Sequence, residues 1–332
     1  MFISVIIPVR NAEGYINRCL EQVRLQDYPH ENIEVIIADG ASTDRTAALA
    51  EGCDLHGISV KVLRLTATGR SAGLNAAIKA SRGSAICRID ARTRVKPDYI
   101  RQCVEVLVRT KAANVGGLQV PCCETATECA IGWAMTHPFG VGNAQFRLAK
   151  RSGFVDTVYP GFFRSDIFTK VGMFDESGGV VSEDSDLNQR IRAKGERIYL
   201  DVGIRAGYEP RASLKEQGRL YFRYGVARTG NLRKHGNLTS WRQLAAPVLV
   251  AMLLGLPCLG FFVPAALIGW AAIVGVYACA DLLVSVHIVV RHSCWRAIPA
   301  LLLVFPAMHL AWGFGFWYGL LLPPKRDEHL SV

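Results

Sequence analysis

Apolar, β-branched runs alternate with helix-like stretches over the N-terminal part of the chain. ISVIIPV (3–9) and IEVIIADG (33–40) end in turn residues, and SAICRID (84–90) alternates apolar with polar positions. Stretches of helical spacing, such as GYINRCLEQVRLQ (14–26), lie between such runs. Strands that alternate with helices predict an α/β domain, expected at 1–204, with a mostly parallel sheet and ligands bound where strands end.

Three long apolar runs follow towards the C-terminus. Residues 244–263 contain no charge, and 265–290 and 297–322 have 26 residues each. Because about 20 apolar residues suffice for a helix to cross a bilayer, we expect three transmembrane helices here, followed by a tail at 323–332. Basic residues flank these runs unequally, which places residues 1–243 in the cytoplasm, on the inner face of a bacterial plasma membrane.

Three crossings would leave the tail on the outer side of that membrane. Pro257 and Pro306 interrupt the first and third runs, so a re-entrant segment is the alternative. Asp281 lies inside the second run, where a carboxylate is costly and often functional. A functional role for Asp281 and a structural one are equally supported. In the structural alternative, Asp281 is either protonated or paired with His309 inside a small helical bundle.

Most of the formal net charge of +10 lies immediately before the first apolar run. Residues 205–243 contain nine Lys or Arg and two Glu, which gives +7. Nucleic acid is one partner for such a segment, but its place beside an apolar run favours an anionic membrane surface. Leucine and aromatic residues are interleaved with the basic ones, so we interpret 205–243 as a basic amphipathic juxtamembrane segment.

The chain contains ten cysteines. Cys122, Cys123 and Cys129 lie close together, but there is no CxxC pair or histidine cluster of zinc-binding spacing. We therefore expect reduced and mostly buried thiols in a cytosolic protein, without a signal peptide.

Polar residues gather where the predicted strands end. Asn11 and Glu13 follow the first strand, Asp39 ends the second and Asp90 ends a later one. Neither GxGxxG nor GxxxxGK is present, so the dinucleotide and P-loop interpretations lack their fingerprints. The pattern predicts several polar groups on one rim of one sheet.

Sequence blocks give this rim a more specific interpretation. SVIIPVRNAEGYI, IEVIIADGASTDRT, GLNAAIKASRG and RIDA resemble, in order, the blocks of the family 2 inverting glycosyltransferases, which have the Rossmann-like GT-A fold. HPFGVGNAQFR, VDTVYPGFFRSDIFTKVGMFDE and SEDSDLNQRIRAKG resemble the membrane-attached glucosyltransferases of succinoglycan and related exopolysaccharide biosynthesis. The resemblance runs from residue 3 to about 235. It implies a nucleotide-sugar-dependent hexosyltransferase.

The resemblance also assigns roles to residues. Asp39 would accept a hydrogen bond from a uracil ring, and Arg70 would meet the nucleotide or its phosphates, its alternative being a solvated loop cation. The residues implied on the donor side are Pro8, Val9, Asn11, Glu13, Asp39, Arg70, Asp90 and Arg92. Those implied on the acceptor side are Phe139, Asp156, Gly161 and Glu183.

Asp184 matches the position of the family's catalytic base. A carboxylate can take the proton of an attacking hydroxyl, and like charges at Glu183 and Asp186 tend to raise its pKa. Taken alone, the local sequence favours a helix start with acids in the first turn. Within the ordered blocks, the role of base is favoured for Asp184.

The RIDART stretch departs from the family pattern. The family places a carboxylate or histidine two residues after its strand-end aspartate, whereas this chain has Arg92, which can be neither a metal ligand nor a base. Mg²⁺ or Mn²⁺ can be held by one carboxylate together with a diphosphate and waters, so Asp90 alone is expected to bind the metal. Arg92 either lies beside the diphosphate or points to solvent.

These inferences predict transfer of a sugar to a polyprenyl-diphosphate-linked saccharide. The donor expected most often is UDP-glucose. Partners are the donor, the lipid-linked acceptor, the membrane and other polysaccharide-assembly proteins, without nucleic acid. The alternatives are a processive polysaccharide synthase and a non-catalytic membrane scaffold that retains the fold. Gln217 and Arg219 only faintly resemble the QxxRW element of processive synthases.

Overall fold

The chain divides into two compact units. The first comprises Met1–Val120 and Ala144–Tyr208, and the second comprises Pro121–Asn143 and Glu209–Val332. This division differs from the expected 1–204 domain chiefly because Pro121–Asn143 belongs to the second unit. The computed structural model describes residues 1–66, 69–176, 183–236 and 241–322.

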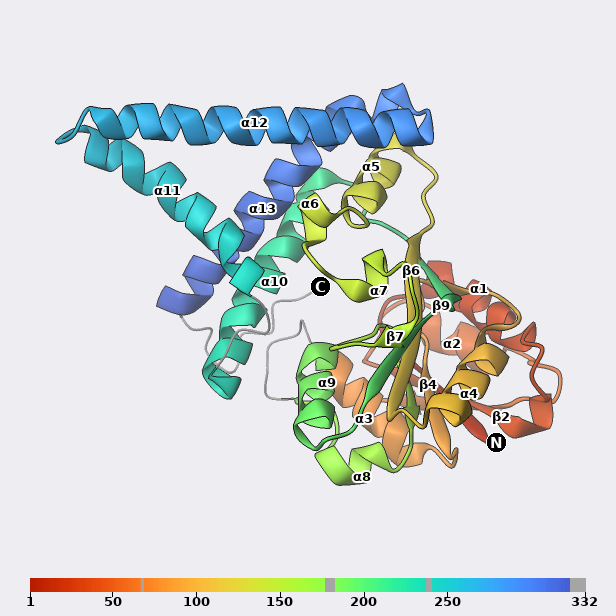
Figure 1. Ribbon diagram of the computed structural model, residues 1–332. Helices are drawn as coiled ribbons and strands as arrows, with labels where there is room; N and C mark the ends of the chain where they lie inside the picture. The colour runs from red at the N-terminus through yellow and green to blue at the C-terminus, as the bar shows by residue number, and fades with distance from the viewer. Residues whose placement is uncertain (67–68, 177–182, 237–240, 323–332) are drawn as a thin grey trace. The chain divides into compact units, whose positions relative to one another are not determined.

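A mixed sheet forms the centre of the first unit (Figure 1). Its parallel part consists of β1 (Ile3–Val9), β2 (Ile33–Asp39), β3 (Ser59–Arg64) and β4 (Ala85–Arg88). β1 pairs with both β2 and β4, and β2 pairs with β3. β1 and β2 are almost wholly apolar and buried, as parallel strands covered on both faces should be. The predicted strands and their parallel arrangement are confirmed.

Antiparallel strands extend this sheet beyond β4. β8 (Phe162–Arg164) pairs antiparallel with β4 and with β6 (Asn114–Pro121). β9 (Ile198–Tyr208) pairs antiparallel with β5 (Thr93–Val95) and with β7 (Gly153–Phe154). β4 therefore lies where the sheet changes from parallel to antiparallel.

Helices cover both faces of the sheet. α1 (Glu13–Arg24) buries Ile16, Cys19, Leu20 and Val23, which are spaced as one helical stripe. It shares a core cluster with α4 (Tyr99–Thr110). α3 (Arg70–Ala80) and α9 (Glu183–Ala193) contribute to a second cluster, so they cover the other face. Shorter helices in this unit are α2 (Thr46–Glu51), α7 (Gln145–Leu148) and α8 (Ile167–Val171).

The described part of the second unit is helical. Its helices are α5 (Ala126–Ala134), α6 (Pro138–Val141), α10 (Leu214–His235), α11 (Ala245–Gly260), α12 (Ala265–His292) and α13 (Ile298–Leu321). By length and composition, α12 and the stretch Trp295–Leu321 could each cross a membrane. α11, at the first expected span, has only 16 residues and is shorter than a full crossing requires.

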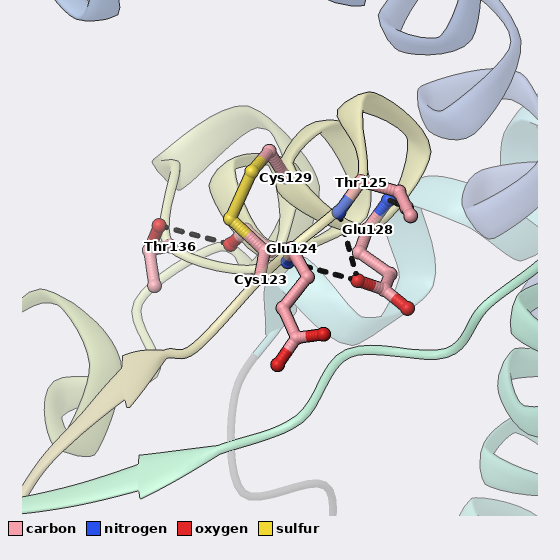
Figure 2. The surroundings of a disulfide bond; sticks show 7 residues. Cys123, Glu124, Thr125, Glu128, Cys129 and Thr136 are labelled. Carbon is pink, nitrogen blue, oxygen red and sulfur yellow. Dashed lines mark hydrogen bonds between the residues drawn. A yellow bond between two sulfur atoms is a disulfide. The ribbon is translucent and has the colours of Figure 1, made fainter.

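A disulfide bond lies at the start of α5 (Figure 2). Cys123 and Cys129 are joined, with Cα atoms 5.0 Å apart, which is within the usual range for a disulfide. Thr125 and Glu128 form a capping box over the same turn. The expectation of reduced thiols is therefore wrong for this pair, because the helical turn brings the two residues together. Of the eight free thiols, Cys19, Cys87 and Cys103 are buried, whereas Cys258 and Cys279 are exposed, so the expectation of mostly buried thiols holds only in part.

Pairing of Asp281 with His309 was one of the alternatives open from the sequence, and the contacts of both residues exclude it. The two ring nitrogens of His309 lie 2.7 Å from the hydroxyl of Tyr277 and 2.8 Å from the carbonyl oxygen of Phe139. The carboxylate of Asp281 instead accepts a hydrogen bond from Ser285, one turn further along α12. Asp281 is thus held within its own helix.

Candidate active site

A fully buried arginine at the end of β4 contacts three carboxylates. Nε and Nη2 of Arg88 donate to the two oxygens of Asp90, at 2.8 and 3.2 Å. Nη1 donates to Oδ1 of Asp184 at 2.7 Å, and Nη2 also donates to Oε1 of Glu183 at 3.1 Å. The Arg88 side chain is 0% exposed, whereas those of Asp90 and Asp184 are 18% and 16% exposed. The guanidinium therefore lies behind the carboxylates, which form the accessible side of the cluster.

Two chain segments bring these residues together. Asp90 lies two residues after the end of β4, and Glu183 and Asp184 are the first residues of α9. Carboxylates in the first turn are stabilised by the helix dipole. Asp184 thus has both of the placements considered from the sequence, since it lies at a helix start and within the polar cluster.

The carboxyl groups of the cluster differ in their pKa values. Burial alone would raise the pKa of Asp90, but the guanidinium groups of Arg88 and Arg70 lower it to about 2. Burial likewise opposes ionisation of Glu183, whose pKa is nevertheless lowered by Arg70 and Arg88. For Asp184, burial outweighs Arg88, and with Glu183 and Asp90 nearby its pKa rises to about 7. Asp184 is therefore the carboxylate of this cluster best suited to exchange a proton near neutral pH.

Tyr159 and Arg70 complete the surroundings of the cluster. The hydroxyl of Tyr159 donates to Oδ2 of Asp90, and the guanidinium carbon of Arg88 lies 5.1 Å from the centre of the Tyr159 ring. Arg70, the first residue of α3, approaches Oε1 of Glu183 at 3.5 Å and is 47% exposed. Arg70 can thus bind Glu183 and still reach an anionic ligand.

The predicted nucleotide-binding residues meet the loop that follows β2. Oδ1 of Asn11 accepts the Thr43 amide at 2.9 Å, and Oε2 of Glu13 accepts the Arg45 amide at 2.9 Å. Asn11 has a φ of 48°, a left-handed conformation that asparagine tolerates. The loops after β1 and β2 are therefore joined by side-chain hydrogen bonds.

Asp39 lies at the base of the same loop. It is buried at the end of β2, pairs in register with Val9, and accepts hydrogen bonds from the amide and hydroxyl of Ser42. Pro8 precedes Val9 in β1, and a Cβ placed on Gly73 of α3 would lie 3.7 Å from the Cβ of Pro8. These residues form one rim of the sheet, as predicted from the strand ends.

Other predicted site residues lie away from the Arg88 cluster. Arg92 is exposed, and its guanidinium carbon lies 4.6 Å from the centre of the Tyr15 ring. Asp156 forms a surface ion pair with Arg192 at 3.2 Å. None of these contacts involves the carboxylates bound by Arg88.

Gly161 and Phe139 occupy different surroundings. The carbonyl of Gly161 accepts the backbone amide of Arg88, and a Cβ on Gly161 would lie 2.4 Å from the Phe163 ring, so the position suits glycine. Phe139 belongs to the second unit, where its ring packs against Phe305 and His309.

Arg88 and Tyr159 are site residues that were not predicted from the sequence. One signal for Arg88 was available, because a charged residue inside the apolar stretch SAICRI is unusual in a buried strand. Its partners are 2, 95 and 96 residues away in the sequence, so the local pattern did not reveal them.

Asp90 provides the donor chemistry that a hard divalent cation requires. Its carboxylate is ionised, and of its roughly four acceptor directions, Arg88 uses two and Tyr159 one. Among the residues that the structure describes, no group of three or more His, Cys, Asp or Glu is placed to hold a metal. Asp90 thus fits as a single protein ligand that shares a metal with a substrate diphosphate.

Comparison with known proteins agrees with this geometry. A family model described as glycosyl transferase family 2 matches residues 4–172. The chain is 30% identical to the succinoglycan biosynthesis protein ExoA of Rhizobium meliloti, over 96% of this chain and 94% of that protein. It is 26% identical to dolichyl N-acetyl-alpha-D-glucosaminyl phosphate 3-beta-D-2,3-diacetamido-2,3-dideoxy-beta-D-glucuronosyltransferase of Methanococcus voltae, over 96% and 97% of the two chains.

A solved structure resembles the chain over almost its full length. The mannosyltransferase PcManGT from Pyrobaculum calidifontis, in complex with GDP-Man and Mn²⁺, covers 97% of this chain and 88% of its own, with 17% identity and a TM-score of 0.61. At this identity the likeness concerns the fold. With the family match, it confirms the expected GT-A architecture followed by a helical C-terminal region.

Proposed function

Because the chain belongs to glycosyltransferase family 2, we propose that it transfers a hexose with inversion from a nucleotide sugar to a lipid-linked saccharide. The donor that we propose is UDP-glucose, and the acceptor is a polyprenyl-diphosphate-linked saccharide of exopolysaccharide assembly. One observation carries the proposal. The guanidinium of Arg88 binds both Asp90 and Asp184, and the pKa of Asp184 is raised to about 7.

Asp184 is the proposed base. Arg88 binds its Oδ1, so Oδ2 is the oxygen assigned to receive the proton of the acceptor hydroxyl. The hydroxyl oxygen forms a bond to the anomeric carbon of the donor, while the bond from that carbon to the diphosphate breaks and the nucleoside diphosphate leaves. The proton moves to Asp184, and attack opposite the leaving group inverts the anomeric centre. General base catalysis of this kind typically contributes ~10²–10⁴-fold in rate.

The donor side is assigned to the rim formed by β1, β2 and their loops. Asp39 and the hydrogen-bonded loop around Asn11 and Glu13 would hold the nucleotide. Arg70, which is half exposed, would contact its phosphates. Asp90 would hold Mg²⁺ or Mn²⁺, which would supply positive charge beside the leaving diphosphate.

The acceptor suggests a membrane location. ExoA is named for succinoglycan biosynthesis, and the Methanococcus voltae relative acts on a dolichyl-linked sugar phosphate. Such acceptors reside in membranes, and the second unit has two helices long and apolar enough to cross one. We infer attachment to the inner membrane, with the first unit, hereafter the catalytic unit, in the cytoplasm. The basic residues that flank the apolar runs should face the same side.

Release of nucleoside diphosphate tests this function. Purified full-length protein would be incubated with a panel of UDP- and GDP-sugars and polyprenyl-diphosphate-linked saccharides, with Mn²⁺ or with EDTA. We expect acceptor-dependent UDP release from one donor, with addition of a single sugar. Addition of many sugars would instead identify a processive synthase. Absence of release from every UDP- and GDP-sugar, with nucleotide still bound, would identify a non-catalytic scaffold.

A further inference from the structure

α10 and α13 lie in direct backbone contact along much of their length (Figure 1). A Cβ on Gly225 of α10 would lie 2.2 Å from the carbonyl oxygen of Trp312, and a Cβ on Gly315 of α13 would lie 2.0 Å from that of Phe222. Glycines at these positions therefore permit a helix approach that any larger residue would prevent.

The two helices run in the same direction along their contact. Further along both helices, a Cβ on Gly319 would lie 3.0 Å from the Cα of Val226. About two turns further along α10, Nη2 of Arg233 donates to the carbonyl oxygens of Gly319 and Leu320, at 2.7 and 2.8 Å. A basic side chain of α10 thus satisfies the last carbonyls of α13.

α10 is charged over its whole length. Its 22 residues include six basic ones, Lys215, Arg219, Arg223, Arg228, Arg233 and Lys234. A basic side chain within the hydrocarbon of a bilayer is costly, and here several would enter together. α10 therefore belongs outside the hydrocarbon, and the half of α13 packed against it, from Trp312 onward, must lie outside as well.

The remaining part of α13 is too short to cross a membrane. Ile298–Ala311 has 14 residues, or about 21 Å at 1.5 Å per residue, against a hydrocarbon core of about 30 Å. Although α13 is apolar enough for a crossing by composition, its packing excludes one.

The helical hairpin of α11 and α12 has the opposite character. No Asp, Glu, Lys or Arg occurs from Ala245 to Ala280. The turn between the two helices exposes Phe261 by 88% and Phe262 by 84%. The base of the hairpin lies beside α13, because the indole nitrogen of Trp317 donates to the carbonyl oxygen of Pro247 at 2.8 Å. The hairpin is uncharged on both sides of its exposed aromatic tip, and Asp281, further along α12, is hydrogen-bonded by Ser285 of the same helix. An apolar tip of this kind fits the hydrocarbon interior of a bilayer.

We propose that the α11–α12 hairpin alone enters the hydrocarbon, and that α13 lies at the membrane surface beside α10. The end of α13 is then on the same face as the catalytic unit, since only residues 209–213, which include two charges, connect β9 to α10. This inference rests on the proposed membrane attachment and replaces the three crossings expected from apolar length.

Reporter fusions to the full chain test the topology. Green fluorescent protein, which fluoresces in the cytoplasm, and alkaline phosphatase, which is active outside it, would each be fused after Val332 in bacterial cells. We expect a fluorescent and phosphatase-inactive pair. Active phosphatase would overturn the proposal. UDP release, measured on the same membranes, reports on transferase function independently of either result.

A second measurement tests insertion of the hairpin. The double variant Phe261→Asp/Phe262→Asp places two charges at the tip, and Phe154→Asp is the matched control at an exposed phenylalanine of the catalytic unit. In carbonate-washed membranes, we expect the double variant to raise the soluble fraction at least tenfold and the control to leave it unchanged. Unchanged partitioning of the double variant, or a wild-type protein found wholly in the soluble fraction, would contradict insertion of the hairpin.

Discussion

Asp184 is held between burial, which opposes its ionisation, and Arg88, which favours it. The resulting pKa of about 7 means that the carboxyl group is mostly protonated at lower pH and cannot accept a proton there. Turnover should therefore rise about tenfold per pH unit below pH 7 and level off above it. Initial rates of sugar transfer, measured at saturating substrates across this range, check the prediction. A flat profile would remove Asp184 from the role of base.

Substitutions at Asp90 and Arg92 distinguish binding of a metal from compensation of the diphosphate charge by arginines. Asp90→Asn should abolish both Mn²⁺-dependent UDP binding and transfer, because the metal loses its ionised ligand. Arg92→Ala should retain metal dependence and at most weaken donor affinity, since Arg92 packs on Tyr15 rather than on Asp90. Calorimetric titration with UDP and Mn²⁺ measures both effects. Undiminished transfer in EDTA would mean that arginines compensate the diphosphate without a metal.

Arg88 is the main support of the cluster because its side chain is inaccessible and two of its partners, Asp90 and Glu183, have lowered pKa values. Arg88→Met would leave Asp90 and Glu183 with the more distant Arg70 as their remaining compensating charge, which should lower the free energy of unfolding by about 3–5 kcal/mol. Arg82→Met is the matched control, since Arg82 also pairs with a glutamate but is 67% exposed, and should cost about 1 kcal/mol or less. Urea unfolding of the three proteins would show the difference, and equal losses would contradict a buried supporting role.

The pattern of apolar residues predicted the parallel strands, whose formation depends mainly on the residues within each strand. The runs 3–9 and 33–40 became β1 and β2 because uninterrupted β-branched residues suit strands covered on both faces. The antiparallel additions and the Arg88 cluster depend on contacts between distant segments, such as that of Arg88 with Asp184. Hydrophobic periodicity carries no information about such pairs. The sequence therefore predicted Asp90 at a strand end and Asp184 at a helix start, but not Arg88, which binds both.

The packing of α10 on α13 gives a prediction at the same scale. Gly315→Leu would place side-chain atoms against the backbone of Phe222 and should destabilise the second unit by about 1–3 kcal/mol. Gly275→Leu on α12 is the control, because a Cβ there meets nothing within 4 Å. Thermal unfolding in detergent, followed by circular dichroism, compares the two. Equal melting temperatures would contradict the close helix contact.

Across the whole molecule, the topology that we propose differs from the one that apolar length alone would give. α13 has the length and composition of a membrane helix, but its partner α10 carries six basic residues. Likewise, Pro121–Asn143 lies in the middle of the matched family region and yet packs with the C-terminal helices. Both features arise from tertiary contacts, which a linear pattern does not encode.

We propose that this chain transfers a sugar with Asp184 as base. Asp184→Asn keeps the size of the side chain but cannot take the proton at neutral pH. Asp166→Asn is the matched control, since Asp166 also binds an arginine, Arg164, but outside the site.

The most direct measurement is turnover of UDP-sugar by the wild type and both variants, with UDP affinity determined in parallel. We expect Asp184→Asn to lose ~10²-fold or more in turnover with nearly unchanged UDP affinity, and Asp166→Asn to lose little. Turnover of Asp184→Asn within a few-fold of the wild type would contradict the account and assign the base elsewhere.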